Sequence, residues 1–178
     1  KHDPPMTSIH KANGSLAEKD EVRLDWLSDI WAELGYMGDP ALDKDCSKHI
    51  VQTWKMDGVA CSLVYKKGKL FKAGLRPRDG VSGEDITENA KYVEGVPEEL
   101  PLKIDVVIRG ELYCPKSTFE KVNKELLASG EIKKPYANPR NYTTGSVRQF
   151  KDPTITKKRQ ISFRAYSALG VKDPPFKT

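Results

Sequence analysis

A lysine with the residue types needed for covalent chemistry stands between two apolar stretches of this chain. Residues 55–58 read Lys-Met-Asp-Gly, and the flanking residues 50–51 and 59–65 both read as strands. A lysine amine attacks only after losing its proton, so it needs a partly desolvated site or nearby cations. A strand flanked by a glycine turn would give it a rigid, recessed position. The same four residues also describe an exposed hairpin turn, so the spacing to other motifs must decide.

Further segments, in a fixed order, favour the nucleophile. Residues 76–85 (Arg-Pro-Arg-Asp-Gly-Val-Ser-Gly-Glu-Asp) follow the expected hairpin, and Arg-Gly-Glu at 109–111 closes a later apolar strand. Ala-Asn-Pro-Arg-Asn at 137–141 precedes Gly-Ser-Val-Arg-Gln at 145–149. With the opening Pro-Met-Thr-Ser-Ile at 5–9, the set resembles the adenylation domain of the NAD-dependent DNA ligases over most of the chain. The two segments after residue 136 discriminate best, because ATP-dependent ligases and capping enzymes are not expected to carry them.

The resemblance implies a DNA ligase that works through a covalent lysyl-AMP. Lys55 would attack the α-phosphorus of NAD⁺, and nicotinamide mononucleotide would leave. AMP would then pass to the 5′-phosphate of a nick in double-stranded DNA, and the 3′-hydroxyl would displace it. Mg²⁺ is implied near Glu111, held mostly by water and phosphate, because no motif supplies a set of metal ligands. Such an enzyme serves DNA replication and repair, as a monomer, in the cytoplasm of a bacterial or phage-infected cell.

Site residues follow from the resemblance position by position. The catalytic set is Lys55, Asp57 and Glu111, with Glu111 expected near the ribose hydroxyls and the metal-bound phosphates. Gly58 is expected because a side chain would obstruct the turn beside the nucleotide. The residues expected to bind the cofactor are Ser8, Ile9, Thr53, Trp54, Lys55, Met56, Gly58, Arg76, Arg78 and Glu111. DNA or phosphate would be bound by Arg140, Arg148, Lys157 and Lys158.

Two positions depart from the family pattern. The family glutamate two residues before the nucleophile, on the adenine side of the pocket, is Thr53 here, so adenine would be recognised through water or backbone. When the Asp-Gly of the family's Arg-Gly-Asp-Gly motif is aligned with residues 79–80, Pro77 stands at the position of the motif's arginine. Arg76 and Arg78 flank it, and one of them is expected to serve instead, with Arg78 the weaker analogy.

Residues 1–178 are interpreted as one portion of an adenylation domain. The resemblance places further parts outside this chain: the subdomain that grips the nicotinamide half of NAD⁺, the last nucleotidyltransferase motif, and the oligonucleotide-binding, zinc, helix-hairpin-helix and BRCT modules. Remaining ligase domains, or a second ligase polypeptide, are therefore implied partners. The isolated chain is expected to be poorly active or inactive.

Charge is distributed unevenly along the 178 residues. Residues 1–114 carry a net charge of −4, whereas residues 115–178 carry +9. The basic end is the candidate polyanion face, and its binding to DNA should depend on salt. A solvated, lysine-rich face is the alternative. The densest cluster comprises Arg140, Arg148, Lys157, Lys158 and Arg159.

The three cysteines do not suggest a metal site. Cys46, Cys61 and Cys114 have no pairwise metal-ligand spacing and read as reduced thiols, with Cys61 in a strand core. No apolar run reaches membrane-spanning length, and the lysine-led start has no signal-peptide core. A soluble intracellular protein is expected.

Periodicity predicts the elements that must position these motifs. The expected helices are 21–34 and 115–129, and the expected strands are 59–65, 70–71, 104–113 and 161–169, the first two joined as a hairpin. Lys55 would then sit at the edge of a sheet. Mixed or antiparallel sheets flanked by segregated helices make the fold class α+β, and the resemblance implies the nucleotidyltransferase fold.

Two other functions stay open. The first is an ATP- or GTP-dependent nucleotidyltransferase, which Thr53 and the missing nicotinamide-binding segment keep open, whereas Asn-Pro-Arg at 138–140 argues against it. The second alternative is a non-catalytic module that binds nicked DNA through its basic half. Replacing Lys55 by alanine separates the two enzymes from the module, since label transfer would stop while DNA binding persisted.

Overall fold

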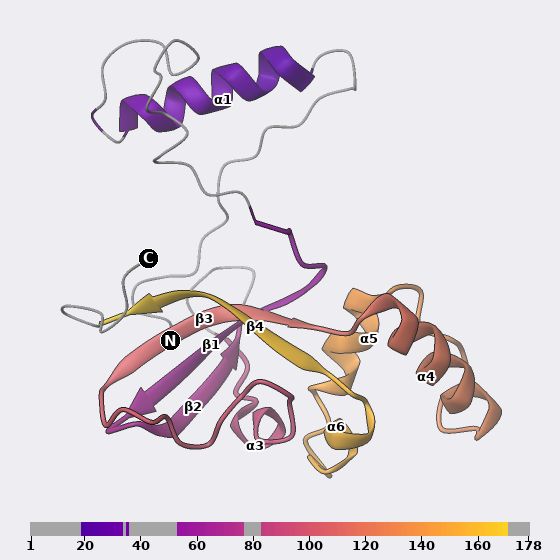
Figure 1. Cartoon of the computed structure of the whole chain (residues 1–178). Coiled ribbons are helices and arrows are strands. Elements are labelled where there is room, and N and C mark those ends of the chain that lie inside the picture. The colour runs from indigo at the N-terminus through magenta and orange to yellow at the C-terminus, as the bar shows by residue number, and fades with distance from the viewer. Residues whose placement is uncertain (1–18, 34, 36–52, 77–82, 171–178) are drawn as a thin grey trace. The chain divides into compact units, whose positions relative to one another are not determined.

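The chain divides into two compact units. The computed structural model describes residues 19–33, 35, 53–76 and 83–170. One unit comprises Thr7–Lys55, and the other comprises Lys1–Met6 with Met56–Thr178. Among the described residues of the first unit, α1 (Lys19–Glu33) is helical, in agreement with the helix predicted over 21–34 (Figure 1). The predicted strand at 50–51 lies outside the described residues.

A four-stranded antiparallel sheet forms the centre of the second unit (Figure 1). Its strands are β1 (Gly58–Lys66), β2 (Lys69–Leu75), β3 (Val106–Tyr113) and β4 (Ser162–Leu169), in the order β2-β1-β3-β4. The predicted hairpin is present as β1 and β2. The prediction placed the strand that follows Lys55 at the edge of a sheet, and this is wrong for β1, which lies between β2 and β3; Lys55 itself precedes β1. The hairpin reveals only one neighbour of β1, because its other neighbour, β3, comes about forty residues later in the chain.

One face of the sheet carries the core. Alternate residues of β1, namely Cys61, Leu63 and Tyr65, are almost fully buried there. The predicted core role of Cys61 is confirmed, since its free thiol is 0% exposed. Residues from β2, β3 and the following segments complete the same cluster, including Ala73, Leu75, Ile86, Leu112, Val122 and Tyr142.

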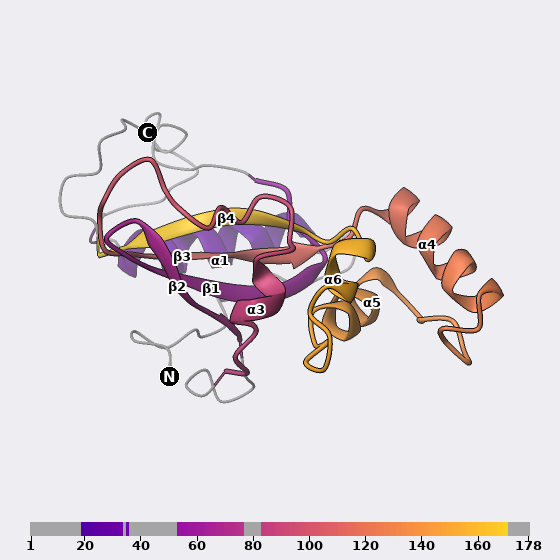
Figure 2. The same cartoon turned by 90° about the horizontal axis from the view of Figure 1, so that it is seen from below.

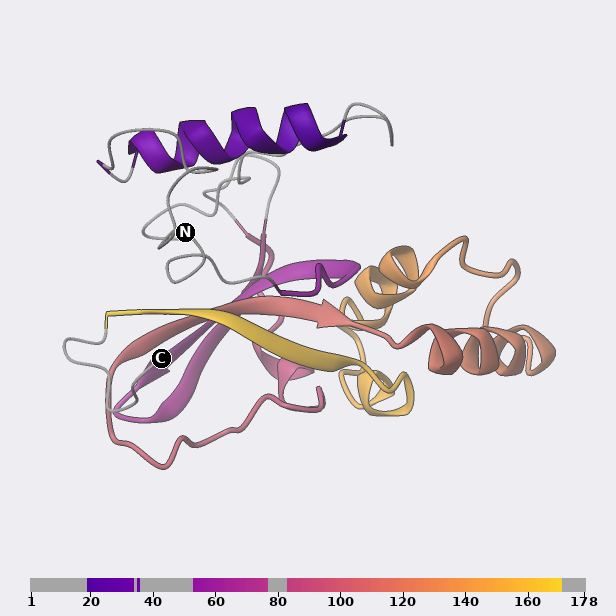
Figure 3. The same cartoon turned by 45° about the horizontal axis from the view of Figure 1, so that its top comes forward.

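The described residues of the second unit also form four helices. They are α3 (Thr87–Ala90), α4 (Lys116–Ala128), α5 (Pro139–Ser146) and α6 (Ile155–Lys158). The contacts are those of α3 with β2, of α5 with β1 and β3, and of α4 with α5. Figures 2 and 3 show α4 extending outward beyond α5, at the end of the sheet toward which β3 runs. The helix predicted over 115–129 is therefore confirmed as α4.

The short helix α5 carries the Asn-Pro-Arg-Asn motif. Asn138 is its N-cap, and the side-chain oxygen of Asn138 accepts a hydrogen bond from the backbone N–H of Asn141 at 2.8 Å. Pro139 occupies the first helical turn, where a missing N–H costs little. The motif thus sets the start of a helix, and Arg140 lies in the first turn.

The side chain of Tyr142 connects α5 to the neighbouring helical segments of this unit. Its ring is 0% exposed and meets Phe119 and Tyr136 edge-on, with centroids 5.7 and 5.3 Å away. Its hydroxyl donates a 2.9 Å hydrogen bond to the backbone oxygen of Arg159. Through this one side chain, α5 is fixed to α4, to the segment before α5, and to the turn after α6.

Three buried groups should make the fold sensitive to alkali. Burial raises the pKa of Cys61 from 9.0 to about 12, and burial raises the pKa values of Tyr65 and Tyr142 from 10.0 to about 12. Their neutral forms are favoured in the folded state, so this contribution to stability is complete below about pH 9 and is lost as pH rises toward 12. The urea midpoint should be constant from neutral pH to about pH 9 and fall steadily above it.

The matched variant is Tyr65→Phe, because the Tyr65 hydroxyl only donates to the backbone oxygen of Pro97, at 2.8 Å. This variant should start from a somewhat lower midpoint and lose less of it at high pH. A midpoint unchanged up to pH 12 would contradict the burial of these groups.

Candidate active site

Lys55 is joined to the central sheet by a short segment without regular structure. Residues 53–57 form neither helix nor strand, and only Met56 and Asp57 lie between Lys55 and Gly58, where β1 begins. Three peptide steps span at most about 11 Å. The Lys55 side chain is exposed, so the recessed position expected from the sequence is not seen. Thr53 is also exposed, and Trp54 is 94% exposed.

Gly58 is required by the packing of two backbones. A Cβ atom at this position would overlap with the carbonyl oxygen of Leu112 and would lie 3.0 Å from Cγ of Glu111. The close approach of β1 and β3 therefore excludes a side chain here. The sequence predicted glycine at this position for a different reason, namely access of the nucleotide.

A row of charged residues crosses the face of the sheet opposite the core, which is called the open face below and carries Ala60 and Glu111. In the register of the strands, Ala60 lies opposite Glu111, and Glu111 lies opposite Arg164. The backbone N–H of Arg76 donates to the oxygen of Ala60 at 2.8 Å and so continues the row beyond β2. Directly opposed residues of an antiparallel sheet point to the same side. Glu111 is therefore flanked on one face by two arginines, one of which is Arg76.

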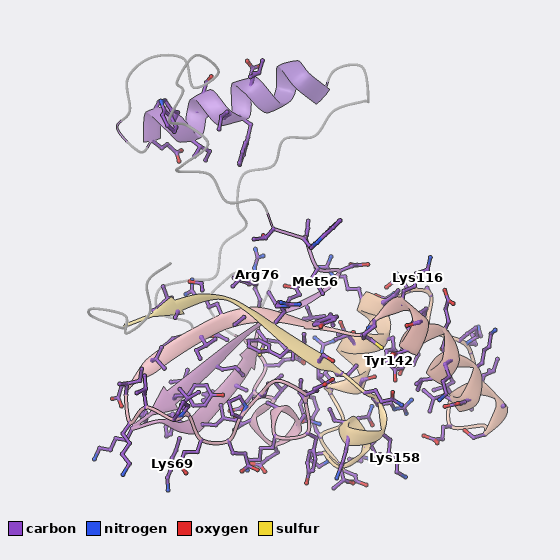
Figure 4. All side chains as sticks on the ribbon, in the orientation of Figure 1. Met56, Lys69, Arg76, Lys116, Tyr142 and Lys158 are labelled. Atoms are coloured by element: carbon purple, nitrogen blue, oxygen red, sulfur yellow. The ribbon has the colours of Figure 1, made fainter. Side chains whose placement is uncertain are left out.

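Figure 4 shows Arg76 on the same side of the sheet as Met56, away from Lys158 of α6. Met56 belongs to the segment that follows Lys55. Of the two arginines that the sequence offered for the altered motif, Arg76 lies on the open face, while Arg78 lies outside the described residues. Ser8 and Ile9 lie outside them as well.

Tyr166 adds a hydroxyl to this face. One step along β3, from Arg109 to Gly110, matches two steps along β4, so Tyr166 is an extra residue on its strand. Partial burial and the charge of Glu111 raise the pKa of Tyr166, whereas Arg76 and Arg109 act in the opposite direction. These electrostatic effects place the four side chains in one neighbourhood.

Sequence reasoning found two members of this group and missed three. Arg76 and Glu111 belong to motifs, and the structure brings them together. Arg109 stands two residues before Glu111 on the same strand, so alternation alone could have identified it. Arg164 and Tyr166 come about fifty residues later and become neighbours only through the register of β4.

The chemistry of the open face fits an adenosine phosphate. Glu111 offers carboxylate oxygens that can accept hydrogen bonds from ribose hydroxyls. Arg76 and its neighbouring arginines offer guanidinium groups for phosphate. The positions between them on β1 and β2 are small, namely Gly58, Ala60, Ser62 and Gly74, so a planar base could lie close to the backbone. An AMP-containing substrate is therefore compatible with this face.

Within the described ranges, no three His, Cys, Asp or Glu side chains converge on a metal position. Of the predicted site carboxylates, Glu111 lies on the open face, opposite Ala60 and Arg164. No helix in the described part of the chain is long and apolar enough to cross a membrane.

A shallow depression lies where residues 94–95 run beside the first half of β4, with Glu94 bridged to Ser162. It is lined by Glu94, Gly95, Tyr113, Ser162, Phe163, Arg164 and Ala165. None of the predicted site residues lines it. The candidate site is therefore built on the open sheet face around Glu111, with Arg164 as the residue common to both.

The predicted phosphate-binding residues occupy different environments. Arg140, Lys157 and Lys158 are exposed on α5 and α6. Arg159 had been included in the basic cluster, and this is wrong, because its side chain is only 7% exposed and lies 3.4 Å from a carboxylate oxygen of Glu131. Arg159 follows the last residue of α6, and its backbone oxygen accepts the hydrogen bond from the Tyr142 hydroxyl. Arg148 is half-exposed and is paired with a carboxylate, as described below.

Together these features define an α+β domain whose antiparallel sheet presents a charged face and whose strand β1 begins at the last residue of the lysine motif. The sequence matches the model of the NAD-dependent DNA ligase adenylation domain over residues 32–178. The chain belongs to this family. The family identification made from the motifs, and the α+β class, are both confirmed.

Curated relatives agree with this assignment. The chain is 41% identical to a DNA ligase of Wolinella succinogenes over 148 residues, which are 83% of this chain and 21% of the relative. It is 46% identical to a DNA ligase of Lactobacillus delbrueckii subsp. bulgaricus over 121 residues, 68% of this chain and 17% of the relative. The chain thus spans about a fifth of the length of the curated relatives it matches.

Proposed function

We propose that this chain is the nucleotidyltransferase portion of an NAD-dependent DNA ligase with the nucleotidyltransferase fold. The observation that carries the proposal is the row from Arg76 through Ala60 and Glu111 to Arg164, on a sheet whose inner strand begins three residues after Lys55. A carboxylate that could accept from ribose and guanidinium groups that could donate to phosphate lie on the sheet that follows Lys55, which supports a role of this lysine as nucleophile. The family match supports NAD⁺ rather than ATP or GTP as the nucleotide.

In the first step, the neutral amine of Lys55 attacks the α-phosphorus of NAD⁺. A nitrogen–phosphorus bond forms, the bond to nicotinamide mononucleotide breaks, and the amine loses a proton. Arg76 and the adjacent arginines stabilise the negative charge that builds up on the phosphate oxygens. Glu111 orients the ribose through its hydroxyls, and Asp57 contributes to the surroundings of the lysine.

Two further components of the site are part of the proposal. Mg²⁺ would neutralise charge on the phosphate oxygens during transfer, near Glu111. Adenine would be bordered by Ser8, Ile9, Thr53 and Trp54, which precede Lys55 in the chain.

The nucleic-acid substrate is nicked double-stranded DNA. AMP moves from Lys55 to the 5′-phosphate, and the 3′-hydroxyl then displaces AMP and seals the strand. Arg140, Arg148, Lys157 and Lys158 would bind phosphates of this DNA. The curated relatives extend well beyond the matched region, which supports further ligase domains as partners of residues 1–178.

The experiment that tests the proposal is nick sealing by the protein at its full natural length. A labelled duplex with a single nick is supplied with Mg²⁺ and either NAD⁺ or ATP, and a nick with a 5′-hydroxyl serves as control. We expect sealing with NAD⁺ only, and only of the 5′-phosphorylated nick. Sealing with ATP alone would assign the chain to the ATP-dependent enzymes. Binding of the nick without sealing under either condition would favour a non-catalytic module.

A further inference from the structure

The side chain of Arg148 is held by a carboxylate far away in the sequence. Its Nε donates a hydrogen bond to Oε2 of Glu84 at 2.7 Å, and its Nη2 contacts the same oxygen. The two residues are 64 positions apart. This contact fixes the plane of the guanidinium group, because both nitrogen atoms of one edge converge on one acceptor.

The backbone on both sides of Arg148 is fixed independently. Asn89 of α3 is 2% exposed, and its side-chain amide donates to the oxygen of Gln149 at 3.2 Å and to the hydroxyl of Thr156 at 3.0 Å. That hydroxyl in turn donates to the oxygen of Ser146 at 2.9 Å. Carbonyl groups before and after Arg148 are thus anchored by one buried network.

Glu84 is itself anchored to the sheet. Its backbone oxygen accepts a 3.0 Å hydrogen bond from the N–H of Leu75, the last residue of β2. The next residue, Asp85, pairs with Gly74 as an isolated bridge. The carboxylate that holds Arg148 therefore belongs to a segment tied to the strand that leads into Arg76.

The contact leaves one edge of the guanidinium group for a ligand. Arginine has five N–H donors, and the edge formed by Nη1 and the second N–H of Nη2 points away from an acceptor bound at Nε and Nη2. Within the described residues this outer edge has no partner, and the side chain is 45% exposed. Two parallel donors on an exposed, fixed edge match two oxygens of a terminal phosphate.

The pair has little value for stability alone. Both side chains are about half-exposed, at 45% and 48%, and ion pairs in such positions contribute little to folding. For comparison, Glu88 pairs with Lys91 at 2.8 Å within one helical turn. The Glu84–Arg148 pair differs because it restrains an arginine whose backbone is also fixed.

We propose that Glu84 is a positioning residue for Arg148, and that the arginine held in this way recognises the 5′-phosphate at the nick. The proposal rests on the proposed function, because it assigns the 5′-phosphate of nicked DNA to this edge. Glu84 contacts neither nucleotide nor DNA. It fixes the direction of the outer donors and so lowers the entropy lost when the phosphate binds.

The test compares nicks that differ only in the terminal phosphate. Affinities for a 5′-phosphorylated and a 5′-hydroxyl nick are measured without nucleotide, for the full-length protein and for Glu84→Ala, Glu84→Asp, Arg148→Ala and the Glu84→Ala/Arg148→Ala double variant. Glu88→Gln is the matched control, since it removes an exposed carboxylate close by on α3. The rate of Lys55 adenylation from NAD⁺ and the KM and kcat for nick sealing are recorded in parallel.

Glu84→Ala should lower the phosphate-to-hydroxyl affinity ratio on the order of tenfold. It should raise the KM for the nick more than it lowers kcat, and leave Lys55 adenylation unchanged. Glu84→Asp should recover part of the ratio, and Glu88→Gln should retain all of it. In the absence of the Arg148 side chain, Glu84→Ala should have no further effect on the ratio.

Three results would overturn the proposal. The first is an unchanged or increased ratio in Glu84→Ala, and the second is the same loss whether or not Arg148 is present. The third is a loss of equal size in Glu88→Gln. Failure of the proposed function would look different, because the unsubstituted protein would then show no Lys55 adenylation and no sealing with NAD⁺, whatever the affinity ratio of the variants.

Discussion

Replacing Lys55 by arginine should abolish sealing of an ordinary nick and spare sealing of a nick that already carries AMP. The amine of Lys55 is needed only to take AMP from NAD⁺ and hand it on. The guanidinium group keeps the positive charge but stays protonated, so it cannot act as the nucleophile. On a pre-adenylated nick, the attacking group is the 3′-hydroxyl, and the lysine nucleophile is no longer required.

The measurement uses gel-resolved sealing of both substrates by the full-length protein. We expect no detectable product from the 5′-phosphorylated nick, and a rate on the pre-adenylated nick within about tenfold of that of the unsubstituted protein. Lys66→Arg is a suitable control, because Lys66 stands over the Phe71 ring at the far end of β1. Sealing of the ordinary nick by Lys55→Arg would exclude Lys55 as the nucleophile.

Gly58→Ala should have the largest effect on stability. Strand propensity alone would favour alanine over glycine, but the added Cβ overlaps with the backbone oxygen of Leu112. The obstacle is the backbone of an inner strand, so the two strands must separate at this end. Overpacking typically costs about 1–3 kcal/mol, and we expect about 3 kcal/mol in the free energy of unfolding, at the upper end of that range.

Gly130→Ala provides the comparison for this prediction. Nothing lies within 4 Å of a Cβ at that position, and the cost comes only from a backbone φ of +74°. That strain is worth about 1–2 kcal/mol. Urea denaturation of both variants should therefore rank Gly58→Ala as clearly less stable. Equal stability of the two would show that β1 can move away from β3 at no cost.

Local periodicity predicted the long elements of this fold. The helices α1 and α4 and the strands β1 and β4 agree with the predicted ranges, since each has a repeating apolar pattern over several turns or residues. The strand β2 is longer than the predicted range 70–71. The prediction was too short because the exposed residues at 69, 71 and 72 do not alternate with apolar ones.

The short helices could not be predicted in the same way. The helix α5 contains Thr, Asn, Gly and Ser, which are poor helix formers, and only its Asn-Pro start is a local signal. Its stability comes from burial of Tyr142, Thr143 and Ser146 against other elements. The helices α3 and α6 have four residues each, too few for a periodic pattern.

The residues of the candidate site likewise fall into those that a local motif identifies and those that only long-range pairing brings together. Lys55 and Glu111 are recognisable because each belongs to a compact motif. Arg164 becomes a neighbour of Glu111 only through the register of β4, which no single segment encodes. The same holds for Glu84 and Arg148, whose contact spans 64 residues. Sequence reasoning also counted Arg159 as a surface cation, because nothing in its neighbours reveals that the turn after α6 directs it toward Glu131.

The most direct test of the central claim is the intact mass of the full-length protein after incubation with NAD⁺ and Mg²⁺, or with ATP and Mg²⁺, followed by peptide mapping. We predict the added mass of one AMP with NAD⁺ only, on the peptide that contains Lys55, and none with the Lys55→Arg variant. An adduct formed with ATP instead of NAD⁺, or an AMP located on another residue, would contradict the account.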